Sequence, residues 1–219
     1  MALRGADRGG PLSQSSRAGR TVRAYIGIGA NLGDARATLE AAIHALAELP
    51  GVRLSAVSPL YVTRPVGVTD QPDFHNAVVA LDVPAGPDPA TGAMDLLVLL
   101  KGLERGFGRQ KRFRWGPREL DLDLLVFGRA RLRVERAPAA RSDDPAKGAV
   151  QWLQVPHASA AQRLFVLAPL ADLAPGLVPP GWGATTATLR DRRQVAEGPD
   201  AIRRSGAWDA RRGGWVTGG

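Results

Sequence analysis

Apolar residues along the chain switch between a period of two, typical of strands, and a period near four, typical of helices. Strand-like patterns run over 22–30, 52–61, 74–81 and 120–127. Helix-like patterns run over 35–49, 90–107 and about 160–170. Up to residue 127 the order is strand, helix, two strands, helix, strand. This order predicts an α+β sandwich with a βαββαβ outline.

Turn-forming residues mark the ends of these elements. Asp34 is placed to cap the first helix, which should stop near Pro50-Gly51. Loops are predicted over 63–72 and in the linker at 84–89. The glycines around 27–33 are not followed by the Gly-Lys-Ser/Thr of a phosphate-binding loop, so we interpret them as a tight turn.

The two ends of the chain lack a clear apolar period. Residues 1–21 combine Gly, Ser, Pro and Arg, and we expect a disordered extension there. Residues 22–180 should form one domain, with an insertion in a surface loop at 137–149. Residues 181–219 are rich in Gly and Arg, so we expect a mobile C-terminal tail.

The composition places limits on the possible functions. The chain has no run of about 18 apolar residues and no secretory leader pattern, so a cytoplasmic protein without a membrane span is expected. Cysteine is absent, which excludes thiol catalysis and thiolate metal sites. The net charge is +8, and residues 101–118 carry seven Lys/Arg against one Glu. Such a focused cluster of cations suits a polyanionic ligand.

Two acidic residues lie directly after this basic segment. In the strand 120–127, the period of two places Leu120, Leu122, Leu124 and Val126 on one face. The other face should carry Asp121, Asp123, Leu125 and Phe127. Paired carboxylates on one face are unfavourable unless a cation neutralises them, and Mg²⁺ prefers carboxylate oxygens. Carboxylates beside cations indicate metal-dependent phosphoryl chemistry.

A second pair of residues points to a flat ligand. Phe74 and Asn76 share a face of their strand, and an aromatic plane beside a carboxamide suits a planar heterocycle. From the residues alone, Phe74 fits ordinary core packing better and Asn76 a turn contact. Glu104 and Arg163 likewise fit surface charges, and Phe165 fits core packing.

Four segments, in order, resemble the 6-hydroxymethyl-7,8-dihydropterin pyrophosphokinase family of folate synthesis. They are AYIGIGANLGD, YVTRPVGVTDQPDFHNAVVAL, RWGPRELDLDLLVFG and VPHASAAQRLFVLAPL, and the resemblance covers about residues 24–180. It implies a ferredoxin-like fold with an antiparallel sheet. It also implies transfer of diphosphate from ATP to the hydroxymethyl oxygen of the pterin, leaving AMP (EC 2.7.6.3).

The resemblance also implies roles for individual residues. Two Mg²⁺ ions would be held by Asp121 and Asp123, which with Arg109 and Arg118 form the catalytic set. The pterin would be bound by Thr63, Arg64, Val66, Phe74, Asn76 and Phe165. ATP would be bound by Glu104, Arg109, Lys111, Arg114, Trp115, Arg118, His157 and Arg163.

Two other functions compete with this interpretation. A basic nucleic-acid-binding protein would explain the charge but not the two aspartates. A nucleotide-sugar transferase would explain the D-x-D pattern alone and leave the other three segments as coincidence. We therefore expect ATP and the pterin as the partners of a monomer, without nucleic acid or membrane.

Overall fold

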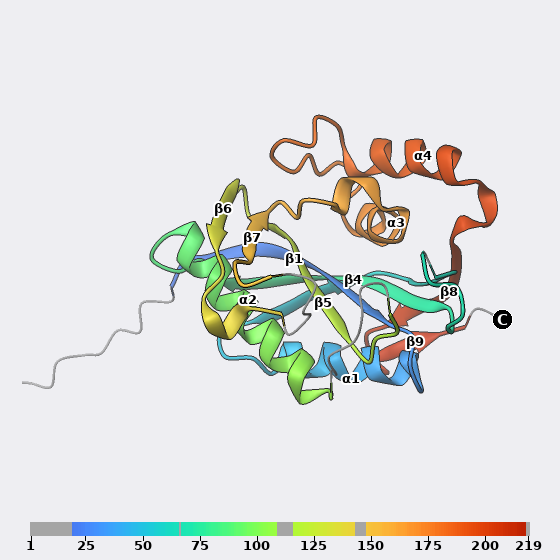
Figure 1. Ribbon diagram of the computed structural model, residues 1–219, viewed down its shortest axis with the longest axis horizontal. Helices are drawn as coiled ribbons and strands as arrows, with labels where there is room; N and C mark the ends of the chain where they lie inside the picture. The colour runs from blue at the N-terminus through green and yellow to red at the C-terminus, as the bar shows by residue number, and fades with distance from the viewer. Residues whose placement is uncertain (1–18, 66, 109–115, 143–147, 218–219) are drawn as a thin grey trace, which may run out of the picture.

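The computed structural model describes residues 19–65, 67–108, 116–142 and 148–217 (Figure 1). Its main sheet is antiparallel, with strands in the order β5-β1-β4-β3-β8-β9, and β2 also pairs with β4. These strands are β1 (Thr21–Ala30), β2 (Arg53–Val57), β3 (Leu60–Thr63), β4 (Phe74–Pro84), β5 (Asp121–Phe127), β8 (Arg203–Asp209) and β9 (Gly214–Val216). The predicted α+β, ferredoxin-like arrangement is confirmed.

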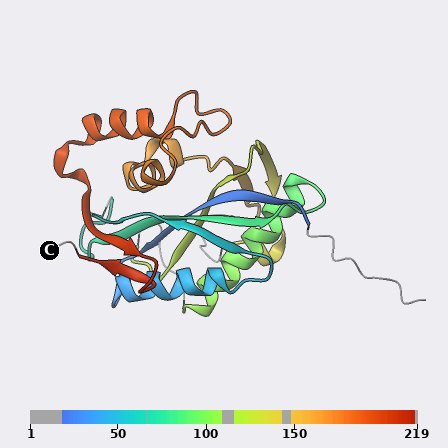
Figure 2. The ribbon, with the colours of Figure 1, turned by 180° about the vertical axis from the view of Figure 1, so that it is seen from behind.

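Helices cover both faces of the sheet (Figures 1 and 2). On one face lie α1 (Ala35–Ala47) and α2 (Pro89–Gly106). On the other, α3 (Leu164–Leu173) packs against β4, and α4 (Thr186–Glu197) packs on α3. Within the described residues, none of these helices combines the length and apolarity needed to cross a membrane. As predicted, Asp34 caps α1, its side chain accepting a hydrogen bond from the Ala37 N–H at 3.0 Å.

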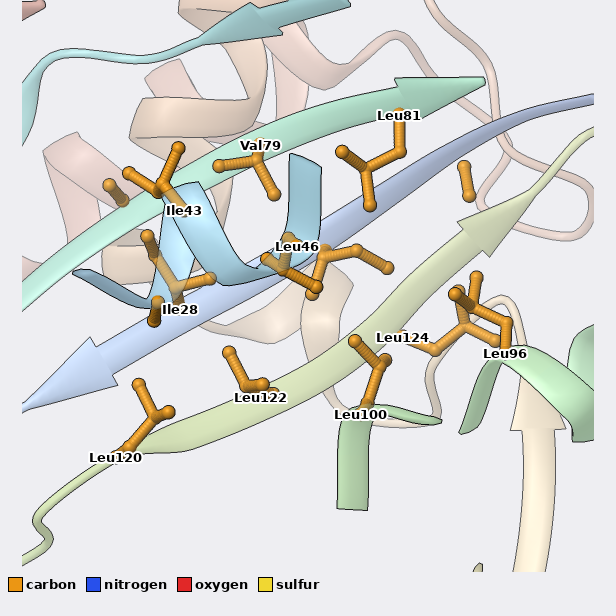
Figure 3. Close-up of a cluster of buried hydrophobic side chains, with 14 of the residues drawn as sticks. Ile28, Ile43, Leu46, Val79, Leu81, Leu96, Leu100, Leu120, Leu122 and Leu124 are labelled. Carbon is orange, nitrogen blue, oxygen red and sulfur yellow. The ribbon is translucent and has the colours of Figure 1, made fainter. Parts of the chain in front are cut away.

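The sheet separates two cores. The larger lies under α1 and α2, where Ile43 and Leu46 of α1 face β1 and β4, and Leu100 of α2 faces β5 (Figure 3). The smaller lies on the α3 side and includes Tyr25 and Val78. Because the two faces of each strand serve different cores, the alternation read from the sequence decides which side chains face α3.

A β-bulge in β5 changes that alternation. Leu124 pairs with Ile26 and Val126 with Tyr25, which leaves Leu125 as an extra residue between them. Leu125 and Val126 therefore both lie on the α3 side, and Phe127 lies in the larger core. The prediction that Val126 shares a face with Leu124 and that Phe127 shares one with the aspartates is wrong, because a bulge shifts the period by one residue.

The predicted strand over 52–61 is also two strands rather than one. It is interrupted at Ser58-Pro59, where β2 ends and β3 begins shortly after. The buried Ser58 accepts a hydrogen bond from the Val78 N–H through its Oγ at 2.9 Å and donates its own N–H to the Val78 carbonyl. Proline has no N–H to continue the ladder, so the strand breaks here while both halves stay paired with β4.

Three short elements follow the aspartates. A two-stranded sheet is formed by β6 (Leu132–Glu135) and β7 (Trp152–Val155), which the sequence patterns did not predict. The 3-10 turn η1 (Pro138–Ala140) packs against α2, and its Ala140 is fully buried. The predicted helix at 160–170 is a 3-10 turn, η3 (Ala160–Gln162), followed by α3.

The C-terminal segment is part of the fold, so the predicted mobile tail at 181–219 is wrong. It forms α4, the turn η4 (Pro199–Ala201) and the hairpin β8–β9, and β8 extends the main sheet at β3. Trp215 is 1 % exposed and lies in the larger core. Its indole N–H donates to the Ser58 carbonyl at 2.8 Å, and its backbone N–H donates to Glu40 Oε1 at 2.9 Å. One buried tryptophan thus anchors a segment whose composition resembles a linker.

Candidate active site

The two aspartates of β5 face the α3 side of the sheet, one residue apart and each partly exposed. Gly29 of β1 pairs with Asp121 on one side and with Asn76 of β4 on the other. Directly paired residues share a face, so Asp121, Gly29 and Asn76 form one row across three strands. With strands about 4.8 Å apart, the carboxylate and carboxamide positions are separated by roughly 10 Å.

Glycines keep the sheet between these groups free of side chains. Gly27 pairs with Asp123 in the next row, so β1 presents no side chain beside either aspartate. A Cβ added at Gly29 would lie 3.2 Å from Asn76 Oδ1, and one at Gly27 would lie 3.4 Å from Leu125. The bare backbone therefore gives a flat floor between the acidic pair and the carboxamide.

Buried groups hold the outer edge of β5 in place. Glu104 Oε1 accepts the Leu122 N–H at 2.7 Å, and Lys101 Nζ donates to the Leu122 carbonyl at 2.9 Å. Lys101 and Glu104 pair with each other at 2.6 Å and are almost fully buried. Glu104 is thus not the surface charge considered from sequence, since it fixes the strand that carries the aspartates. Its predicted contact with the nucleotide stays a prediction.

Asn31 connects three loops around the site. Its Oδ1 accepts the Arg118 N–H at 2.7 Å, and its own N–H donates to the Arg118 carbonyl at 3.0 Å. Its Nδ2 donates to Gln71 Oε1 and to the Pro72 carbonyl, both at 3.0 Å. Asn31 is 3 % exposed, and sequence reasoning interpreted it as a turn residue. It holds Arg118 where that guanidinium lies 3.6 Å from Asp121 Oδ1.

The residues predicted for the pterin partly come together. Asn76 is buried and donates to Thr63 Oγ1 at 3.0 Å, and Phe74 is half-buried on the same face. Arg64 is exposed, and Phe165, half-buried, packs against the smaller core from α3. The Arg163 guanidinium carbon lies 5.7 Å from the Phe165 ring centroid, so a predicted ATP residue adjoins a predicted pterin residue.

A pocket of about 260 Å³ lies beside Asp123. Its wall includes apolar side chains and several polar ones, namely Leu97, Asp123, Leu124, Arg133, Arg136, Trp152, Leu153, Gln154, His157 and Ala158. Sequence reasoning missed Arg133, Arg136 and Gln154, because they lie in or next to the β6–β7 hairpin and outside any recognised motif. Their common signal is a pair of short strands with alternating apolar residues, a pattern that by itself has many meanings.

His157 joins the pocket to β5. Its backbone N–H donates to the Leu125 carbonyl at 2.9 Å. The imidazole Nδ1 accepts from the Ser159 backbone N–H at 3.4 Å. Burial lowers the pKa of His157 below its ordinary value, although the Asp123 charge opposes this effect. The lowered pKa favours the neutral imidazole, and the Ser159 contact at Nδ1 favours the tautomer with its proton on Nε2.

Five predicted residues lie outside the described part of the chain. They are Val66 of the pterin set and Arg109, Lys111, Arg114 and Trp115 of the ATP set.

The aspartate pair fits a magnesium site that is completed by a substrate. Among the described residues, no group of three or more His, Asp or Glu side chains lies close enough to hold a metal. Mg²⁺ commonly binds through one or two carboxylates together with waters and substrate phosphates. Asp121 and Asp123 supply such a donor set, and cations and the pocket lie beside it.

Comparison with known proteins identifies one family. Residues 25–175 match the model of 7,8-dihydro-6-hydroxymethylpterin-pyrophosphokinase. A 2-amino-4-hydroxy-6-hydroxymethyldihydropteridine pyrophosphokinase of Pseudomonas aeruginosa is 44% identical over 155 residues, covering 71% of this chain and 82% of that protein. A protein of the same name from Methylorubrum extorquens is 40% identical over 157 residues, covering 72% and 85%.

Solved structures support the fold. The chain superposes on wild-type Plasmodium falciparum HPPK-DHPS with pteroate at a TM-score of 0.65 and 15% identity. The match covers 90% of this chain but 48% of that one, so the chain spans about half the length of the solved structure.

Proposed function

We infer the activity from the family, because the chain belongs to the 7,8-dihydro-6-hydroxymethylpterin-pyrophosphokinase family. It is therefore a pyrophosphokinase of folate biosynthesis (EC 2.7.6.3). We propose that it transfers the β,γ-diphosphate of ATP to the hydroxymethyl oxygen of 6-hydroxymethyl-7,8-dihydropterin and releases AMP. The row Asp121–Gly29–Asn76 carries this proposal, because it places a carboxylate suited to a metal ion and a carboxamide suited to a heterocycle on the same face of the sheet.

Asn76 and the two phenylalanines would bind the pterin. The Asn76 carboxamide can exchange paired hydrogen bonds with the amide edge of the ring, and Thr63 fixes its orientation. Phe74 and Phe165 come from β4 and α3, and both are partly exposed, so each has ring surface available for stacking. A pterin bound there would project its hydroxymethyl group along Gly29 towards Asp121.

Asp121 and Asp123 would hold two Mg²⁺ ions together with the triphosphate. When bound, these ions neutralise phosphate charge that otherwise repels the attacking oxygen. Arg118 is held by Asn31 and can turn from Asp121 to a phosphate oxygen. His157 can donate from Nε2, and Arg163 can supply a further cation. The pocket beside Asp123 has the partly apolar wall and the few polar groups that suit a nucleoside.

The product of ATP turnover tests this proposal. Purified protein with ATP and Mg²⁺ should form AMP only when the hydroxymethylpterin is present, with one pterin diphosphate per AMP. ADP as the product, or AMP formed at the same rate without the pterin, would contradict it. Family membership already favours this reaction over the nucleotide-sugar transferase suggested by the D-x-D pattern.

Replacing Gly29 with alanine should weaken pterin binding about 10-fold. The new Cβ would lie 3.2 Å from Asn76 Oδ1, so the carboxamide must move away from the position that orients the ring. Calorimetric titration with the pterin measures the change, and affinity for an ATP analogue should stay the same. Gly102→Ala, where a Cβ meets nothing within 4 Å, is the matched control. Equal pterin affinity of G29A and wild type would show that the floor is not part of the pterin site.

A further inference from the structure

Arg136 is a half-buried cation that none of the recognised motifs contains. It follows β6 directly, and its backbone N–H donates to the Gln151 carbonyl at 2.7 Å. Its Nε donates to the Trp152 carbonyl at 3.1 Å. The backbone bond holds Arg136 beside Gln151, and the Nε bond ties its guanidinium to the first residue of β7, so the guanidinium is positioned before any ligand binds.

The Nη1 atom of Arg136 is buried and makes no hydrogen bond within the described residues. Buried polar atoms are nearly always paired, and an unpaired charged nitrogen is especially costly. Burial accordingly lowers the pKa of the Arg136 guanidinium, and the charges of Asp123 and Glu104 offset this effect only in part. The guanidinium stays protonated, since an arginine pKa lies far above neutral pH.

Arg136 lines the same pocket as Asp123 and His157. Arg133, which also lines the pocket, is already engaged, because its guanidinium carbon lies 4.0 Å from the Trp152 ring centroid. Apolar walls from Leu97, Leu124 and Leu153 suit a nucleoside at this place. A phosphate attached to that nucleoside would lie between the apolar wall and the aspartates. There its oxygens could accept the hydrogen bond that Arg136 Nη1 otherwise lacks.

We propose that Arg136 binds the α-phosphate of ATP and keeps hold of it as the phosphate of AMP. This inference rests on the proposed function. In the reaction, the hydroxymethyl oxygen forms a bond to the β-phosphorus. The bond from the β-phosphorus to the oxygen that bridges it to the α-phosphorus breaks. The electron pair stays with the α-phosphate, and the hydroxyl proton goes to solvent. Arg136 stabilises the charge that the α-phosphate gains, and it acts as a binding residue of the nucleotide pocket.

The affinity ratio of AMP to adenosine isolates this contact, because the two ligands differ only by the phosphate. In equilibrium titrations of the full chain, Arg136→Met should weaken AMP binding about 10- to 100-fold and leave adenosine binding unchanged. Arg136→Lys, which keeps the charge, should recover part of the loss. Arg129→Met, an exposed arginine before the same hairpin, should behave as wild type.

Each outcome has a definite meaning. Loss of AMP affinity with unchanged adenosine affinity supports the α-phosphate contact. Unchanged AMP affinity in R136M overturns it, and so does an equal loss of AMP and adenosine, which would indicate a purely structural role. Pterin-dependent AMP formation by wild type is measured in parallel. If wild type fails that assay, the proposed function is wrong; if wild type passes it and R136M keeps its AMP affinity, only the role of Arg136 is wrong.

Discussion

Asp123→Asn should lower kcat/KM for ATP by at least about 1,000-fold, because it removes a charge from the pair that we propose binds Mg²⁺. Asparagine has the size of aspartate, and Asp123 lies partly exposed on β5, so the fold should be unaffected. Asp121→Asn should have a similar effect, and the double variant should be little worse than either one. In the proposed site the two carboxylates act on the same ions, so their losses should not add.

Steady-state AMP formation measures the effect over a range of Mg²⁺ concentrations. Chelation of Mg²⁺ by EDTA should abolish the activity of wild type, and restored Mg²⁺ should recover it. Asp95→Asn, an exposed acid on α2, is the matched control and should keep full activity. A D121N/D123N variant with normal pterin-dependent AMP formation would remove the basis of the proposed mechanism.

Trp215→Ala should destabilise the protein by about 3–5 kcal/mol, because it empties a fully buried position in the larger core. The indole also packs edge-on against Trp208, with ring centroids 5.1 Å apart. For a chain of this size the expected fall in Tm is roughly 10 °C. Trp215→Phe keeps most of the ring but leaves the Ser58 carbonyl without its donor, so it should cost only about 1–2 kcal/mol.

Chemical and thermal denaturation measure both variants. Val195→Ala is the control, since Val195 is 87 % exposed on α4 and should have no measurable effect. If W215A unfolds at the wild-type denaturant concentration, the C-terminal hairpin is not part of the cooperative core. The hairpin also supports β3, whose Thr63 orients Asn76, so W215A should raise the KM for the pterin more than the KM for ATP.

The sequence determined the central sheet and its acidic pair. Alternating apolar residues placed Leu120, Leu122 and Leu124 in one core, and the period of two then required Asp121 and Asp123 to face the other side. The same rule placed Phe74 and Asn76 on one face. These predictions are confirmed because they depend only on neighbouring residues along one strand, and short-range backbone geometry is shared by all strands.

The tertiary structure decided what depends on contacts between distant segments. The bulge at Leu125 became visible only through its pairing with β1, and the row through Gly29 needed the register of three strands. Asn31, Glu104 and Arg136 are held in position by partners that are distant in sequence, namely Arg118, Leu122 and Trp152. Trp215 lies in a stretch with a linker's composition, and only its burial against α1 and Ser58 makes it part of the core. Local patterns fix which way a side chain points, whereas burial and pairing are set by what the rest of the chain brings to it.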